Sequence, residues 1–482
     1  MGRITSYFGL SDDKPEVIRL AATFAGLSTS MTAAISISAT FYLIFVAETL
    51  GNGSYINGLV LAGLLIVVQK IVQTLFDYPT GTIGDLVGQR WVLSSAFLTY
   101  SIAFFIVSSI SKSSQFGHYL LVYILMGFAA SQESGAIDSW FDNNYSLAVP
   151  EDKNKVQYGV FIGKVAMLLR VSRALVILPG AFIAVLIARA FVFQMQSVIC
   201  ILMALSALVL VKDFPIVKKD RESKPIAEEY VSLLKQSARH VISNPFLKYI
   251  ILGNTIFLSI GFTWAELIMY PFLYQYLISD VAVASLMTVV IIVFAVFWER
   301  SGVWAKRFDP EGWIPRFRFI QSVGAVFFWL FALLMLVFPP PTVDSEQINI
   351  FIPSTDILIL QVPSLSVTPV ILILIIWLSG GIFFTTAAIL WMRVLIDVIP
   401  NRIRNGVYSL LPTLVVLASI PQVAGFGWLI PLVGISTTLF LCGCISTIGA
   451  LMIRKGLRFP KPWLHEPADY PEQELEQVDD DS

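Results

Sequence analysis

The feature that most constrains this chain is a series of twelve long apolar stretches, each close to the length that crosses a lipid bilayer. A transmembrane helix needs about 20 predominantly apolar residues to span the hydrocarbon core. Only 13% of the 482 residues are charged, whereas soluble domains average about 25%. The sequence therefore predicts an all-α membrane protein. The twelve predicted transmembrane helices are 24–49, 56–77, 91–110, 118–142, 157–187, 190–211, 249–276, 281–299, 317–338, 367–392, 404–429 and 431–453.

Lys and Arg residues are distributed unevenly over the connections between these helices. The two terminal segments and every second connection hold 26 of the 32 basic residues, whereas the opposite connections hold only Lys112 and Arg189. Cytoplasmic loops are enriched in Lys and Arg. Both termini are therefore predicted to be cytoplasmic, which requires an even number of spans. We expect a multi-pass protein of the plasma membrane.

The longest basic connection divides the spans into six and six. The predicted parts are a first six-helix half at 1–211, a cytoplasmic linker with an amphipathic helix at 212–248, and a second half at 249–454. The segment 455–482 is strongly acidic beyond its first residues and is predicted to be a disordered cytoplasmic tail. The halves also echo each other weakly, with SGAIDSW in the fourth helix and SGGIFFT in the tenth. Repeated halves with a binding site between them are an architecture of secondary transporters.

Catalytic and cofactor-binding patterns are missing from the sequence. The three cysteines fall inside predicted spans and the three histidines are scattered, so they form no metal site or nucleophilic constellation. No phosphate-binding GxxxxGK[ST] loop is present. We therefore expect no enzymatic activity, catalytic residue, cofactor, metal or nucleic-acid partner. The expected partners are a small-molecule substrate, protons and the bilayer, and we expect a monomer.

A specific polar turn, PTGTIGDLVGQRW, lies between the second and third helices. Two helices that reverse direction at a membrane surface need a tight turn, and glycine supplies one. That requirement accounts for Gly81, Gly84 and Gly88, but not for Asp85 and Arg90. A carboxylate at this depth is costly unless it has a partner.

The segment GTIGDLVGQR resembles the signature loop of the major facilitator superfamily, with matches at Gly81, Asp85, Gly88 and Arg90. The resemblance extends to the twelve spans and implies two pseudo-symmetric six-helix halves. The equivalent loop of the second half, SGVWAKRFDPEG, keeps Gly302 but has Lys306 where the aspartate would stand. This departure implies that the two halves do not latch symmetrically.

The resemblance also implies a gating role for the turn. Asp85 would meet the start of the eleventh helix near Asn405, and Arg90 would pair with Asp138 or Asp142. These contacts would hold the halves in the outward-facing state. The alternative is a turn that stabilises the fold and has no gating role.

Charged residues inside the predicted spans are candidates for a functional site, because each costs roughly 2.5–3.5 kcal/mol near the bilayer centre. One interpretation is a basic pocket in which Lys70, Arg170 and Arg173 hold an anionic solute, with Glu133 as partner or proton carrier. The other is a structural network that pairs Glu133 with Arg170 or Lys70. Glu266, near the outer end of the seventh helix, could serve as an external gate, a cation-binding patch or a proton site.

These observations predict a secondary active transporter of a small solute, with an anionic solute as one candidate. It would work by alternating access, and proton coupling could involve Glu133 or Glu266. One alternative is a multidrug exporter driven by proton antiport. Another is a membrane sensor or scaffold that uses the same fold without transporting.

Overall fold

The computed structural model describes residues 7–10, 14–150, 152, 156–212, 226–342, 345–351, 358–399 and 401–462. Within these ranges, the side chains of residues 78, 82, 85, 86, 156, 226–234, 359, 401–406 and 409 lie outside the description. The predicted disordered tail lies outside the described residues from position 463 onward.

The chain is a bundle of helices with one small β-hairpin. The strands β1 and β2 are antiparallel, and Gln347 lies opposite Pro363. The elements are α2 (Pro15–Ser36), α3 (Tyr42–Leu50), α4 (Tyr55–Val87), α5 (Gln89–Ser108), α6 (Phe116–Glu133), α7 (Ala136–Ala148), α8 (Val156–Leu186), α9 (Arg189–Leu210), α11 (Ile226–Ser243), α12 (Pro245–Thr263), the π-helix η2 (Trp264–Ile268), α13 (Met269–Leu277), α14 (Asp280–Ala305), α15 (Pro310–Ile320), α16 (Ala325–Val337), β1 (Gln347–Phe351), β2 (Leu358–Pro363), the 3-10 helix η3 (Ser364–Ser366), α17 (Val367–Val398) and α18 (Asn401–Gly456).

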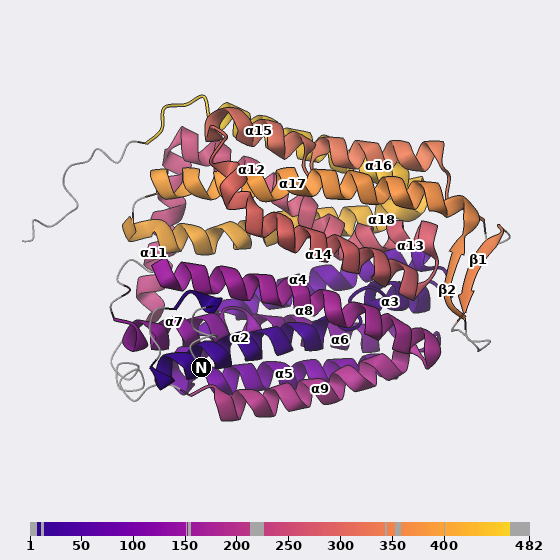
Figure 1. Cartoon of the computed structure of the whole chain (residues 1–482), viewed down its shortest axis with the longest axis horizontal. Coiled ribbons are helices and arrows are strands. Elements are labelled where there is room, and N and C mark those ends of the chain that lie inside the picture. The colour runs from indigo at the N-terminus through magenta and orange to yellow at the C-terminus, as the bar shows by residue number, and fades with distance from the viewer. Residues whose placement is uncertain are drawn as a thin grey trace, which may run out of the picture.

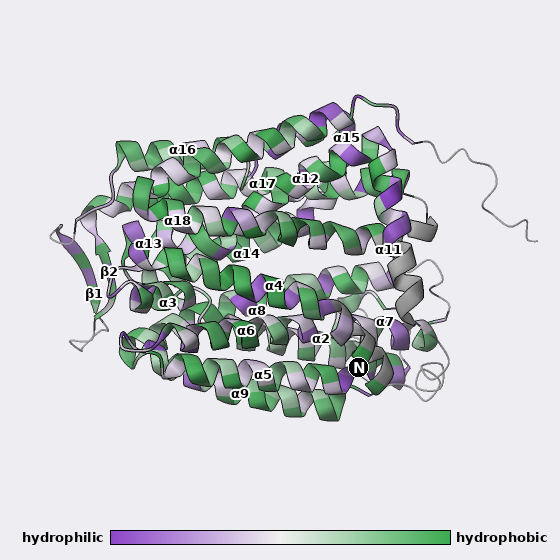
Figure 2. Cartoon of the chain, turned by 180° about the vertical axis from the view of Figure 1, so that it is seen from behind, coloured by the Kyte–Doolittle hydropathy of each residue, from purple (hydrophilic) through white to green (hydrophobic). Residues whose placement is uncertain are grey.

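The helices form two groups that lie side by side (Figure 1). The first group runs from α2 to α9 and the second from α12 to α18; α4 packs against α18 and α8 against α14 where the groups meet. The helix α11 lies at one end of the bundle and the β-hairpin at the other, and we call these the α11 end and the hairpin end. Hydrophilic residues gather on α11 and at the neighbouring end of α15, while the bodies of the long helices are mostly hydrophobic (Figure 2).

The number of membrane crossings depends on α18. Eleven helices among the described residues are long and apolar enough to span a membrane, which makes the chain a multi-pass membrane protein. One of them, α18, has 56 residues and is interrupted at Gly434, where φ is 82°. Val407 and Ile453, near its two ends, lie in the same buried cluster as Phe246, so the chain must reverse at Gly434. The two arms of α18 therefore count separately, in agreement with the twelve predicted spans.

The ninth helix begins earlier than predicted, at Pro310 and not at residue 317. The Asp309 side chain accepts a hydrogen bond from the Gly312 amide, and a proline at the first helical position has the backbone geometry that a helix start needs. Arg318, which we expected in a cytoplasmic connection, is consequently buried. Its guanidinium donates to Asn254 Oδ1 over 3.0 Å and lies over the ring of Phe257.

Close backbone contact between α12 and α18 gives the first testable prediction. A Cβ atom on Gly449 would lie 2.8 Å from the carbonyl oxygen of Gly253. We expect Gly449→Ala to destabilise the protein by about 1–3 kcal/mol, as overpacking does. Gly425→Ala is the matched control, since a Cβ there meets nothing within 4 Å. Thermal unfolding in detergent should show a lower midpoint for Gly449→Ala alone; equal midpoints would contradict this packing.

Candidate functional site

A cavity of about 360 Å³ lies between the two groups of helices, and we call it the central cavity. Its walls come mainly from α3, α4, α5, α6 and α8 of the first group and from η2 and α13 of the second. One basic and one acidic side chain line it, together with several hydroxyl and amide groups. The polar and charged lining residues are Ser38, Tyr42, Gln69, Tyr100, Tyr123, Arg173, Glu266 and Tyr270. Such a mixture of aromatic surface and a few converging polar groups is typical of small-molecule sites.

An ion pair joins the two groups beside this cavity. Lys70 Nζ on α4 lies 3.4 Å from Glu266 Oε1 on η2, with side-chain exposures of 12% and 38%. The ammonium also donates to Gln73 Oε1 over 3.4 Å and lies 4.9 Å from the centre of the Phe262 ring. The Glu266 carboxylate is therefore paired with the ammonium of Lys70 from the opposite half.

The π-helix sets the direction of Glu266. A π-helix widens the turn, and such segments are frequent at functional sites. Within η2, Trp264 is buried and packs against Phe272 and Phe331, whereas Glu266 faces the central cavity. Tyr270 therefore lies at the cavity together with Glu266, whereas Trp264 lies in the packed interior.

The two arginines of α8 have different surroundings. Arg173 lines the central cavity, as does Tyr270 of α13. Arg170, one turn closer to the α11 end, donates to its own helix at Ala166 and lies 4.9 Å from the centre of the Trp298 ring on α14. The structure thus brings Arg173 and Glu266 to one cavity, with Lys70 joined to Glu266, and leaves Arg170 outside its lining.

Glu133 lies apart from these residues. It is the last residue of α6 and is not among the residues that line the central cavity. In the described part of the chain it forms no ion pair, and Lys70 pairs with Glu266 instead. The network of Glu133 with Lys70 or Arg170, one of our two interpretations, is not formed in this structure, because the partner of Lys70 comes from the other half.

The polar turn differs in shape from our expectation. Helix α4 continues through Gly81 and Gly84 to Val87, and the turn is made by Gly88, whose φ of 103° favours glycine. Assigning Gly81 and Gly84 to the reversal was therefore wrong. A Cβ on Gly84 would lie 2.4 Å from Oε1 of Gln89, the flexible end of a side chain that can move aside.

The structure describes the side chains of three charged residues of the gating hypothesis: Arg90, Asp138 and Asp142. Arg90 is exposed, and its guanidinium lies 5.2 Å from the centre of the Trp91 ring. Asp138 and Asp142 lie on α7, and neither forms an ion pair with Arg90 in the described structure. The side chains of Asp85 and Asn405 lie outside the described residues. The gating contacts of Asp85 and Arg90 therefore remain a prediction.

A cluster of polar side chains that was not predicted from the sequence closes the hairpin end. Arg189 at the start of α9 donates from Nε and Nη2 to Asp280 at the start of α14, over 2.8 and 2.7 Å. Its Nη1 donates to Glu48 Oε2 over 2.9 Å, and the Tyr274 hydroxyl also donates to Asp280. We call these four residues the outer clamp. Arg189 was one of only two basic residues predicted in the non-cytoplasmic connections, and this rarity was the one feature of the sequence that pointed to it.

The outer clamp joins the two groups of helices mainly through Asp280 and Arg189, whose side chains are largely shielded from water. The side chain of Asp280 is 5% exposed and that of Arg189 is 24% exposed. Bidentate pairs between arginine and a carboxylate are among the stronger charge-assisted hydrogen bonds. Close to the clamp, Leu360 of β2 packs beside Ala181 of α8 and Ala284 of α14. In this structure the two groups are therefore held together at the hairpin end.

The fold is shared with solved transporters of low sequence identity. A D-xylose–proton symporter matches over 92% of this chain and 98% of its own, with 14% identity and a TM-score of 0.63. The nucleoside transporter NupG matches over 92% and 100%, with 13% identity and a TM-score of 0.65. The xylose transporter XylE from E. coli in an inward-open conformation matches over 92% and 96%, with 15% identity and a TM-score of 0.55. No protein-family model matches the chain, and no curated protein matches it in sequence. At these identities the likeness concerns architecture, and the chain has the fold of the major facilitator superfamily.

Proposed function

We propose that this protein is a secondary active transporter that moves a small solute carrying an anionic group by alternating access. The observation that carries the proposal is the central cavity, which lies between two groups of helices and contains Arg173. Transporters of this architecture bind substrate between their halves. A xylose–proton symporter and a nucleoside transporter share the fold, which supports transport as the activity.

The lining residues have distinct roles in this proposal. Arg173 binds the anionic group of the solute, because a guanidinium presents two parallel donors to a carboxylate or phosphate. Tyr42, Tyr100 and Tyr123 supply aromatic surface and hydroxyl groups to the rest of the solute. Glu266 is the proton-binding group, and protonation would remove its attraction to Lys70 and so loosen one connection between the halves.

The observed arrangement fits one state of the transport cycle. The outer clamp holds the hairpin end together, so we infer an inward-facing state, with the α11 end on the cytoplasmic side of the plasma membrane. In the outward-facing state Asp85 would meet the region of Asn405, and Arg90 would pair with Asp138 or Asp142. We further propose that the transporter works as a monomer.

A thermal-stability screen tests the proposed substrate class. The purified protein is heated with anionic metabolites, sugars, amino acids and lipophilic cations. A ligand present at about a hundred times its Kd should stabilise the folded protein by about 2.7 kcal/mol. We expect an anionic solute to produce this shift, Arg173→Gln to abolish it, and Arg170→Gln to retain it, because Arg170 does not line the central cavity.

The other outcomes separate the alternatives. Stabilisation by lipophilic cations alone, unaffected by Arg173→Gln, would favour a multidrug exporter. Binding of an anionic solute without uptake into proteoliposomes would favour a sensor or scaffold. Equal loss of the shift in the two arginine variants would mean that α8 contributes through its packing, and the assignment of Arg173 would fall.

A further inference from the structure

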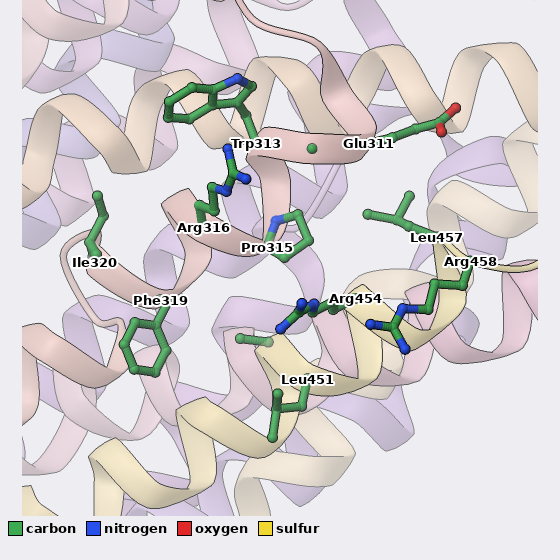
Figure 3. A pocket seen from close by; sticks show the side chains of 12 residues that line it. Glu311, Trp313, Pro315, Arg316, Phe319, Ile320, Leu451, Arg454, Leu457 and Arg458 are labelled. Atoms are coloured by element: carbon green, nitrogen blue, oxygen red, sulfur yellow. The ribbon is translucent and has the colours of Figure 1, made fainter.

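A second large pocket lies far from the central cavity, between α15 and the end of α18. Its volume is about 750 Å³, and it shares no lining residue with the central cavity. Figure 3 shows the side chains that line it. We call it the α15–α18 groove. It lies at the α11 end and on the outside of the bundle, where Leu451 in its wall is 56% exposed. In a membrane this position faces lipid near one bilayer surface.

Three arginines from two helices line the groove. Arg316 comes from α15, while Arg454 and Arg458 come from the end of α18 and the residues just after it. All three are exposed, and within the described residues none of them forms an ion pair. The only acid in the lining, Glu311, is engaged with Lys461 over 2.7 Å. The groove therefore offers three arginines against one carboxylate, which is already paired with Lys461.

The lining changes from charged to apolar with depth in the membrane. From Arg458 to Ala450 the chain runs inward from the α11 end, and from Arg316 to Ile320 α15 runs the same way. The arginines thus lie nearest the membrane surface, and Leu451, Ala450 and Ile320 lie deeper. Trp313 stands beside Arg316, whose guanidinium is 5.1 Å from its ring centre, and tryptophan is enriched at membrane interfaces.

We propose that the α15–α18 groove binds an anionic phospholipid. The three arginines hold its phosphodiester headgroup, and an acyl chain lies along Leu451 and Phe319. Basic pockets between transmembrane helices at the cytoplasmic surface suit such headgroups. A lipid fits better than a soluble phosphate, since the groove continues into apolar walls that a soluble anion would leave uncovered.

The test uses the full chain, delipidated in detergent, and counts bound lipid by native mass spectrometry during titration. The probes are phosphatidylglycerol and phosphatidylcholine with the same acyl chains. We expect phosphatidylglycerol to bind at least about tenfold more tightly to the wild type, a difference of about 1.4 kcal/mol. The triple variant Arg316→Gln/Arg454→Gln/Arg458→Gln should lose this preference. The variant Arg300→Gln/Lys306→Gln/Arg307→Gln removes the same charge at exposed positions outside the groove and should keep it.

Three results would overturn the proposal. The first is equal weakening in both triple variants, which would indicate diffuse electrostatic attraction. The second is equal affinity for the two lipids. The third is displacement of phosphatidylglycerol by millimolar inorganic phosphate, which would indicate a phosphate site. Thermal unfolding of each variant checks that it is folded, and Arg454→Gln alone should give an intermediate affinity if the triple variant is not.

Discussion

Replacing Arg189 with alanine is expected to open the hairpin end of the protein. The substitution leaves the Asp280 carboxylate, which is only 5% exposed, without its bidentate partner. Breaking a buried pair in this way typically costs about 3–5 kcal/mol. Since each 1.4 kcal/mol is a factor of ten, the ratio of clamped to open molecules should fall by about a hundredfold or more.

Spin-label distances can measure this change. Cysteines at the exposed positions Ser113 and Thr342 place one label on each group of helices at the hairpin end. Arg189→Ala should move the main distance to a longer value, whereas Glu48→Gln should change it little, because it leaves both hydrogen bonds to Asp280. If the two variants give the same distribution as the wild type, the outer clamp does not hold this end closed.

Replacing Glu266 with glutamine is expected to uncouple transport from protons. The variant keeps the shape of the side chain but cannot gain or lose a proton or pair its charge with Lys70. With a coupling free energy of about 1–3 kcal/mol, accumulation driven by a pH gradient should fall by about 5–150-fold. Exchange of solute across proteoliposomes, which needs no net proton movement, should persist.

Glu133→Gln is the matched control for this experiment. Glu133 was an equal candidate from the sequence, but it does not line the central cavity. It should retain gradient-driven accumulation. The reverse result, with Glu133→Gln uncoupled and Glu266→Gln unaffected, would move the proton site to α6. Loss of exchange in Glu266→Gln would instead assign this residue to solute binding.

The fold was largely predictable because the bilayer imposes a length on every spanning helix. The apolar stretches located the crossings, and the signature loop at Gly81 to Arg90 indicated the architecture. The irregular backbone was not predictable. Apolar length does not encode an inserted residue such as the one that makes η2 a π-helix, and the position of η2 depends on how Trp264 packs against residues of α16 and α17.

The candidate site was only half predictable for a related reason. A charged residue inside a span costs free energy to place in the bilayer, so it stands out in the sequence as a functional candidate. Lys70, Arg173 and Glu266 were identified for this reason. The partner of such a residue is set by the way the two halves meet, and helical periodicity carries no information on that arrangement. The sequence therefore suggested Glu133, in the same half, as the partner of Lys70, whereas the structure pairs Lys70 with Glu266. The outer clamp was not predicted because Arg189 and Asp280 lie at helix ends, where charged residues are common.

The β-hairpin has a practical consequence for trapping the protein in one state. It connects α16 to α17, so it must travel with the second group of helices, yet Leu360 rests against α8 of the first. The outer face of β1 is largely exposed, including Ile348 and Ile350. An antibody fragment that binds this face and the end of α8 at once would hold the two groups of helices together at the hairpin end. It would arrest the cycle from outside the membrane, without a ligand and without a mutation.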